Sequence, residues 1–334
     1  MKNRVIIQKY MVAQRDMSMD LAKAIAMALV CIAHSYEMTI GNASSFRPIF
    51  STFYMPLFMM ICGYFSHHSL MLPLCDILVK KAKQLLLPTM SGILLICVIE
   101  FLLNSKVDVV MEIIGGLWFL KTLFICYLIV AVFKQLRLSD AMTCLFSCII
   151  LLLIPKGSFL QVNFLLIMFW AGYFLRKYLD WFTRNYQSLT IVGIVLFCIF
   201  IYLGYDDAPE QLTYNYIINN YWVVIIQILT GLIGSISVIG ASKYVLNSNR
   251  EGCFVYNISI LGRYTLGIYV VQSIVIERII NHYLHINPNA RCSLQILDWI
   301  ITPLLGCVLM FLCYGIVRLL ERNKIINSML FGKV

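Results

Sequence analysis

The amino-acid sequence predicts an all-α polytopic membrane protein, a helix bundle of about ten transmembrane helices with both termini in the cytoplasm. Two features of its composition lead to this prediction: 61% of the 334 residues are hydrophobic and only 13% are charged. A soluble domain carries roughly 25% charged residues, so this chain has too few to cover a globule in water. A third observation is that the apolar residues gather into ten runs separated by short polar connections.

These runs are helical rather than β-stranded, because a backbone exposed to lipid must satisfy its own hydrogen bonds and the chain lacks the alternation of a barrel. A spanning helix needs about 20 apolar residues, so ten spans occupy nearly the whole chain. We therefore expect a single integral-membrane domain over residues 1–334 and no sizeable soluble domain. The runs are 17–37, 48–65, 85–103, 117–134, 140–154, 159–175, 189–205, 221–241, 259–276 and 296–320.

The distribution of basic residues predicts the orientation of the bundle. With the N-terminus inside, eighteen Lys and Arg lie in cytoplasmic segments and only five in outer loops, namely Arg47, Lys106, Lys156, Arg278 and Arg291. Cytoplasmic loops carry such an excess, so we expect a multi-pass protein of the cytoplasmic membrane. The net charge of +10 then reflects topology and attraction to anionic membrane lipid, and no nucleic-acid partner is expected.

Cysteine placement argues against both disulfides and metal. Nine of the twelve cysteines lie within apolar runs, Cys75 and Cys253 lie in predicted cytoplasmic loops, and Cys292 is alone outside. The chain has no Cys-x-x-Cys pair and no Cys/His cluster with zinc spacing. We therefore expect no metal site.

The first apolar run holds four ionisable residues, Asp20, Lys23, His34 and Glu37. Such residues cost about 2.5–3.5 kcal/mol each within a span and usually mark a functional site. Lys23 and His34 are eleven residues apart, which is about three helical turns and roughly 16 Å. Both therefore face one stripe, with Asp20 and Glu37 close enough to pair on the same side. One interpretation is a buried structural histidine; the other, which four ionisable groups favour, is a stripe that lines a polar cavity.

Short motifs continue in order along the chain. They include MPLFMMICGY at 55–64, KKAKQLLLP at 80–88, Leu-Trp-Phe-Leu at 117–120, Trp170 with Gly172 and Tyr173, and Gly262, Thr265, Leu266, Ile268 and Tyr269. Together with the acid, base and histidine of the first run, this series resembles the integral-membrane acyltransferase-3 family, whose members move acyl groups, usually acetyl, onto envelope carbohydrates. Three positions depart from the family pattern: Lys23 and Gln84 stand where Arg is usual, and Gln272 where His is common.

The resemblance implies a membrane O-acyltransferase that moves an acetyl group from acetyl-CoA, a co-substrate rather than a bound cofactor. The implied acceptor is a hydroxyl of a cell-envelope polysaccharide, glycolipid or lipid-linked sugar. His34 is the only histidine within a span, and neutral imidazole is the natural general base near pH 7. Glu37 would orient the imidazole, and Lys23 would hold the thioester carbonyl or a phosphate.

Further residues are candidates for substrate binding. Asp20 would pair with Lys23, the cluster of Lys80, Lys81 and Lys83 would bind the CoA phosphates, and Tyr64 and Trp118 would line the cavity. Alternative interpretations stay open: the lysines are typical of a positive-inside anchor, and the aromatic residues of interfacial anchors. A transporter or exporter of a small carboxylate or an acylated glycan is the alternative function, although the chain lacks the internal repeat common in transporters.

The charge count makes a direct prediction about topology. A membrane-impermeant maleimide applied to sealed cells should label Cys292 and leave Cys75 and Cys253 unmodified until the inner membrane is lysed. Labelling of Cys75 or Cys253 in sealed cells would overturn the predicted orientation.

Overall fold

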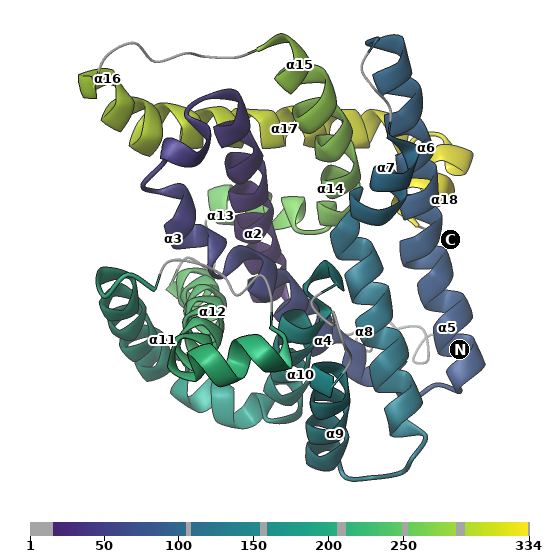
Figure 1. The fold of residues 1–334 in the computed structure, drawn as a ribbon, viewed down its shortest axis with the longest axis vertical. Helices are drawn as coiled ribbons and strands as arrows, with labels where there is room; N and C mark the ends of the chain where they lie inside the picture. Colours follow the sequence, from purple (N-terminus) through teal and green to yellow (C-terminus); the bar gives the residue numbers. More distant parts are fainter. Residues whose placement is uncertain are drawn as a thin grey trace, which may run out of the picture.

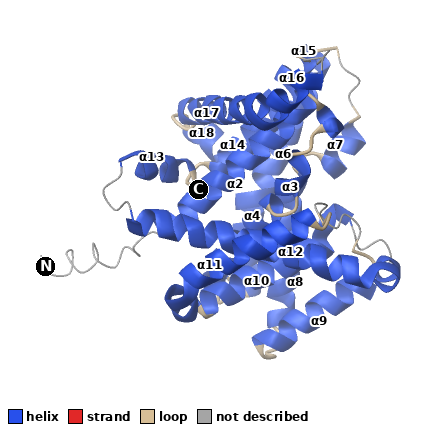
Figure 2. Ribbon diagram, turned by 90° about the vertical axis from the view of Figure 1, so that its left-hand side faces the viewer, coloured by secondary structure: helices blue, strands red, loops and turns tan. Residues whose placement is uncertain are grey.

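The computed structural model describes residues 16–104, 108–153, 159–205, 212–248, 253–284 and 291–332. Within these ranges every regular element is a helix and none is a strand, as Figure 2 shows. The all-α prediction is therefore confirmed. The side chains of Cys253 and Cys292, on which part of the labelling experiment depends, lie outside the described residues.

The α-helices alternate with short 3-10 or π turns, labelled η. The first half contains α2 (Met17–Ser35), η1 (Tyr36–Met38), η2 (Gly41–Ala43), α3 (Arg47–Ser51), α4 (Tyr54–Ser69), α5 (Leu74–Lys81), η3 (Ala82–Leu86), α6 (Leu87–Leu102), α7 (Val109–Gly115), α8 (Trp118–Lys134) and α9 (Asp140–Leu153). The second half contains η4 (Phe159–Gln161), α10 (Val162–Lys177), α11 (Leu179–Tyr202), α12 (Tyr214–Ser248), α13 (Cys253–Leu261), α14 (Thr265–Ile274), η5 (Val275–Ile280), α15 (Asn281–Tyr283), α16 (Arg291–Ile296), η6 (Leu297–Ile301), α17 (Thr302–Leu320) and α18 (Lys324–Phe331).

Fewer helices are long enough to cross a membrane than the sequence predicts. Six helices of the described chain are long and apolar enough, and up to eight if α7 with α8 and α13 with α14 each cross as one bent pair. The prediction of about ten is therefore too high. The two remaining apolar runs form α9, of 14 residues, and α10, of 16 residues. Most of α10 is buried against other helices. Its apolar side chains therefore contact protein rather than lipid, and hydropathy alone does not distinguish these two environments.

Helix α2 runs through the middle of the bundle, where it contacts α4, α12, α13, α14 and α17 (Figure 1). Its N-terminus is capped by Asp16, whose carboxylate accepts hydrogen bonds from the backbone N–H groups of Ser18 and Met19, the usual role of an aspartate at this position. A helix surrounded by others on so many sides places its polar residues between helices instead of against lipid.

Helices α4 and α10 approach so closely that their glycines cannot be replaced freely. A Cβ atom on Gly63 would overlap the carbonyl oxygen of Phe169, and one on Gly172 would overlap the carbonyl oxygen of Met60. Small residues permit such backbone contact between helices in membranes, where van der Waals packing drives association. Both glycines belong to the Gly-Tyr motifs of the sequence, which therefore have a packing explanation.

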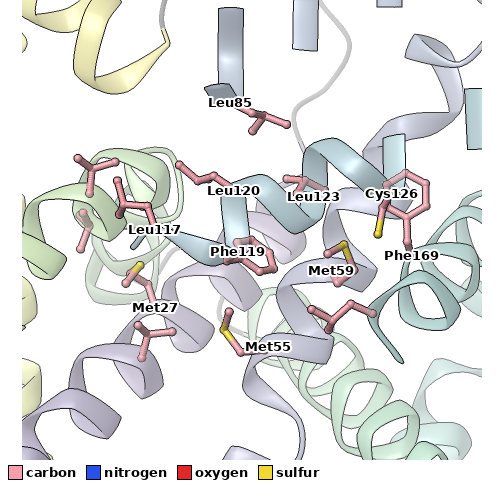
Figure 3. Packing of buried hydrophobic residues seen from close by; sticks show 14 of the residues in the cluster. Met27, Met55, Met59, Leu85, Leu117, Phe119, Leu120, Leu123, Cys126 and Phe169 are labelled. Atoms are coloured by element: carbon pink, nitrogen blue, oxygen red, sulfur yellow. The ribbon is translucent and has the colours of Figure 1, made fainter. Parts of the chain in front are cut away.

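A large cluster of buried apolar side chains fills the space between α4, α8 and η3. Figure 3 shows Phe119, Leu120 and Leu123 of α8 between Leu85 on one side and methionines, among them Met55, on the other. Methionine fills irregular gaps well because it is unbranched and flexible. This cluster positions the start of α8, which forms one wall of the site described below.

The α4–α10 contact leads to a stability prediction. Gly172→Val should prevent the two helices from packing, with a loss of about 1–3 kcal/mol or more in the free energy of unfolding, because its side chain would meet the backbone at Met60. Thermal unfolding and size-exclusion chromatography in detergent measure this loss. Gly315→Ala is the matched control, since a Cβ atom at Gly315 meets nothing within 4 Å; equal unfolding midpoints for the two variants would contradict the prediction.

Candidate active site

A cavity of about 280 Å³ opens beside His34, and we call it the chamber. Helix α2 contributes Val30 and His34 to its wall, and α4 contributes Tyr54 and Met55. The facing wall comes from α14 and η5, and the third from the joint between α7 and α8. The chamber is thus assembled from segments that lie far apart in the sequence.

His34 lies between two carboxylates. Its Nδ1 is 3.4 Å from Oε1 of Glu37, and its Nε2 is 3.4 Å from Oε1 of Glu277. Glu277 lines the chamber with His34, whereas Glu37 is not part of the lining and lies 3.5 Å from Nη2 of Arg47. The Nε2 side of the imidazole is therefore the side directed toward the chamber, and the charge of Glu37 is balanced by an arginine.

Glu277 is held in place by its own segment. The side-chain N–H of Gln272 donates to Oε1 of Glu277 at 2.9 Å, and the Ser273 hydroxyl donates to Oε2 at 3.4 Å. Tyr269, Ser273 and Glu277 follow one another at four-residue intervals and line one wall of the chamber. Gln272 thus fixes the carboxylate that lies beside the nitrogen of His34 that faces the cavity.

Arg278 ties three segments together at the chamber wall. Its Nε is 3.2 Å from Oε1 of Glu100 on α6, and its Nη2 donates to Oε1 of Glu112 on α7. The Arg278 cation of η5 thus balances two half-buried carboxylates, one from α6 and one from α7. Arg278 was expected in an outer loop, but the structure places it in the wall of the cavity.

The break between α7 and α8 directs Glu112 and Trp118 into the chamber. Leu117 adopts a left-handed conformation with φ +49°, and a Cβ atom on Gly116 would meet the Glu112 carboxylate at 2.6 Å. The Lys121 ammonium donates to the last carbonyls of α7, those of Ile113 and Ile114, at 2.8 Å each. A cation at a helix C-terminus is favourable, so Lys121 stabilises the break instead of adding a charge to the cavity.

A second, apolar cavity of about 90 Å³ adjoins the chamber, and we call it the slot. Its walls include Phe58 and Cys62 of α4 and the α8 side chains Phe119, Leu120 and Leu123, three of the residues in Figure 3. The slot and the chamber share three lining residues, Val30, Met55 and Tyr269, which we call the neck. The polar chamber and the apolar slot therefore lie next to each other and share part of their walls.

The structure brings together only some of the residues singled out from the sequence. His34 and Trp118 line the chamber, and Glu37 lies beside His34. Lys23 lines neither cavity; it pairs with Asp20 at 3.2 Å, and its Nζ lies 4.3 Å from the centre of the Phe65 ring. With about 16 Å of helix between Lys23 and His34, the two do not act on the same atom.

Tyr64 belongs to a different polar cluster. Its hydroxyl donates to Oδ2 of Asp16 at 3.0 Å and accepts from Nη1 of Arg176 at 2.9 Å, and its side chain is buried. It lines neither the chamber nor the slot. The structure therefore does not bring Tyr64 and His34 to one of these two cavities.

The three lysines at the start of the third run also separate. Lys80 and Lys83 are exposed, whereas Lys81 turns inward and its Nζ lies 4.1 Å from the centre of the Tyr127 ring. The hydroxyl of Tyr127 in turn donates to the carbonyl of Cys62 in the slot wall, at 3.4 Å. Of the three, only Lys81 is thus linked to a cavity. Among the described residues, no group of His, Cys, Asp and Glu is arranged to hold a metal ion.

The sequence profile of the acyltransferase-3 family, described as an acyltransferase domain, matches residues 17–318. The chain therefore belongs to this family, as its motifs predict.

Two curated relatives are nodulation proteins NolL. The protein from Mesorhizobium japonicum (strain LMG 29417 / CECT 9101 / MAFF 303099) is 26% identical over 226 residues, 60% of this chain and 59% of the relative. That from Sinorhizobium fredii (strain NBRC 101917 / NGR234) is 28% identical over 156 residues, 42% of this chain and 43% of the relative. The chain thus matches about six tenths or less of each relative's length. No solved structure matches this chain.

The ion pairs of Arg278 make a second stability prediction. Arg278→Met should lower the free energy of unfolding by about 3–5 kcal/mol, because it leaves the partly buried carboxylates of Glu100 and Glu112 without their cation. Adding Glu112→Gln should recover part of the loss, since one uncompensated charge is removed. Arg322→Met, at an exposed position, is the control, and an Arg278→Met unfolding curve that coincides with the control would refute the argument.

Proposed function

We propose that this acyltransferase is an O-acetyltransferase of the cytoplasmic membrane. It moves the acetyl group of acetyl-CoA to a hydroxyl of a cell-envelope polysaccharide, glycolipid or lipid-linked sugar. One observation supports the proposal above all others: His34 faces a polar chamber with one ring nitrogen and a carboxylate with the other. That chamber adjoins an apolar slot.

The geometry suits His34 as the general base. The carboxylate of Glu37, 3.4 Å from Nδ1, favours the tautomer with the proton on Nδ1, which leaves the Nε2 lone pair for the hydroxyl of the acceptor. When that hydroxyl attacks, its proton moves to Nε2 and the imidazole becomes positively charged. Glu277, 3.4 Å from Nε2, then stabilises this charge, and Gln272 and Ser273 keep its carboxylate in place.

The slot suits the donor. Acetyl-CoA is made in the cytoplasm, and both termini and the basic loops of this chain are proposed to lie on that side. The acetyl thioester at the end of the pantetheine arm is small and largely apolar, so this end of the donor fits a narrow apolar passage. Lys81 at the Tyr127 side of the slot, Lys23 further along α2, and the exposed Lys80 and Lys83 then supply positive charge for the CoA phosphates.

The chamber suits the acceptor. A volume of about 280 Å³ has room for a sugar ring, which the slot of about 90 Å³ does not. Its walls combine the aromatic rings of Tyr54 and Trp118 with the charged groups of Glu112 and Arg278. Aromatic faces pack against the C–H faces of a sugar, and ionised groups make the stronger hydrogen bonds to its hydroxyls.

Release of CoA by the purified protein, with acetyl-CoA and envelope glycans as acceptors, tests the proposed reaction. His34→Ala should lower kcat by about 10²–10⁴ because the general base is lost, while the protein still elutes as a monodisperse species. Glu37→Gln should reduce kcat less, since the imidazole remains. His68→Ala, an exposed histidine of α4, is the control and should keep wild-type activity.

Turnover at the wild-type rate by a well-folded His34→Ala protein would remove His34 from the mechanism. Mass spectrometry of surface glycans from a deletion strain should reveal the acceptor by its missing acetyl groups. A deletion strain with unaltered glycan acetylation would contradict a carbohydrate acceptor.

A further inference from the structure

Tyr269 places a hydroxyl at the neck, the one part of the wall that the chamber and the slot share. Val30 and Met55, the other two residues of the neck, offer aliphatic and thioether surface. In the proposed reaction the thioester carbonyl lies where the donor cavity meets the acceptor cavity. Of the three neck side chains, only Tyr269 brings an O–H group to that point.

The hydroxyl oxygen of Tyr269 accepts a hydrogen bond from the backbone, so the hydroxyl proton points away from that backbone group. The backbone N–H of Phe119 donates to Oη of Tyr269 at 3.4 Å, so the phenol oxygen is an acceptor in this contact. Phe119 is the second residue of α8, whose first N–H groups lack partners within the helix. The positive end of the helix dipole lies at the same place. An oxygen that accepts such a bond becomes a better donor through its own proton.

The ring of Tyr269 is also fixed in position. It packs edge-on against the Phe119 ring, with 6.1 Å between the ring centroids. Its neighbour on the same helix face, Ser273, lies one turn further toward Glu277. A donor that is already oriented needs no reorganisation when charge develops, which is the condition for strong transition-state stabilisation.

The spacing along α2 relates the neck to the base. Val30 precedes His34 by one helical turn, so the neck lies roughly 6 Å from the imidazole along the helix axis. Reacting atoms lie about 3–3.5 Å apart before attack. An acceptor oxygen beside His34 can therefore approach a carbonyl carbon whose oxygen points toward the neck.

We propose that Tyr269 is a catalytic residue that donates a hydrogen bond to the oxyanion of the tetrahedral intermediate, an inference that rests on the proposed function. The acceptor oxygen forms a bond to the carbonyl carbon and gives its proton to Nε2 of His34. The π electrons of the carbonyl move to its oxygen, which accepts the hydrogen bond of the Tyr269 O–H. The C–S bond then breaks, the carbonyl re-forms, and the CoA sulfur takes the proton from His34.

The cations near the site are less suited to this task. Lys23 is three turns from His34 and paired with Asp20, and Lys121 is bonded to the carbonyls of α7. Arg278 lies in the chamber wall but is engaged by Glu100 and Glu112. This assignment replaces the expected role of Lys23 at the thioester carbonyl and leaves Lys23 to the donor phosphates.

Tyr269→Phe tests the assignment, because it removes the hydroxyl and keeps the ring that packs on Phe119. Loss of one oxyanion donor should lower kcat by about 10²–10³, with KM for acetyl-CoA nearly unchanged. Tyr264→Phe is the matched control: it lies five residues earlier, and its hydroxyl accepts from Arg318 away from both cavities. That variant should keep the kcat of the wild-type protein.

A wild-type kcat in Tyr269→Phe, or a raised KM with kcat intact, would overturn the role of Tyr269 and leave the proposed function standing. Absence of acetyl transfer by the wild-type protein to any glycan would overturn both. If Tyr269→Phe does not fold, 3-fluorotyrosine incorporated at position 269 provides the second test, since it keeps the shape of the side chain.

The fluorinated phenol ionises at lower pH and a phenolate has no proton to donate, so the alkaline fall of kcat should move to lower pH. The other titratable and charged groups of the two cavities are unchanged in this variant and cannot cause the shift; they are His34, Tyr54, Glu112, Glu277 and Arg278 in the chamber and Cys62 in the slot. An alkaline limb identical to that of the wild-type protein would overturn the assignment.

Discussion

Lipid does not solvate charge, so every ionisable side chain that this chain carries into the membrane needs a partner from the protein itself. The first helix meets this need with Lys23 beside Asp20 and with His34 between Glu37 and Glu277. The contact of His34 with Glu277 joins α2 to η5, because separation would leave a charge in an apolar medium. The arrangement of these two segments, and thus the shape of the chamber, depends on it.

The same constraint explains why the site combines distant segments. Arg278 joins α6, α7 and η5 through two carboxylates, and Glu277 reaches His34 from more than two hundred residues along the chain. A helix that is interrupted can turn several polar groups toward one point, as the break at Leu117 does for Glu112 and Trp118. The ion pairs that balance charge within the bundle therefore also contribute to the lining of the chamber.

The sequence predicted the helical class and the family, because hydropathy and motif order are local properties. The histidine count within spans was wrong, since the candidate span Arg47–Ser69 also carries His67 and His68, although the structure does place His34 in the chamber wall. The sequence could not predict that Glu277 and Arg278 belong to the site. Both follow the end of the apolar run at 276, and only the π turn η5 continues the helix past them to α15. The three lysines are close in sequence but point in different directions, since Lys81 at the end of α5 packs on the Tyr127 ring while Lys80 and Lys83 are exposed.

The neck has a consequence for the energised membrane. Charged and polar groups approach it along α2 from Lys23 on one side and from His34 on the other, so a file of water through the neck would let protons leak down their gradient. Narrow passages with apolar walls empty of water and block ions. Val30, Met55 and the leucines of the slot form such walls. Apolar side chains at the neck would therefore separate the polar chamber from the charged groups at the other end of α2 and oppose the passage of ions between them.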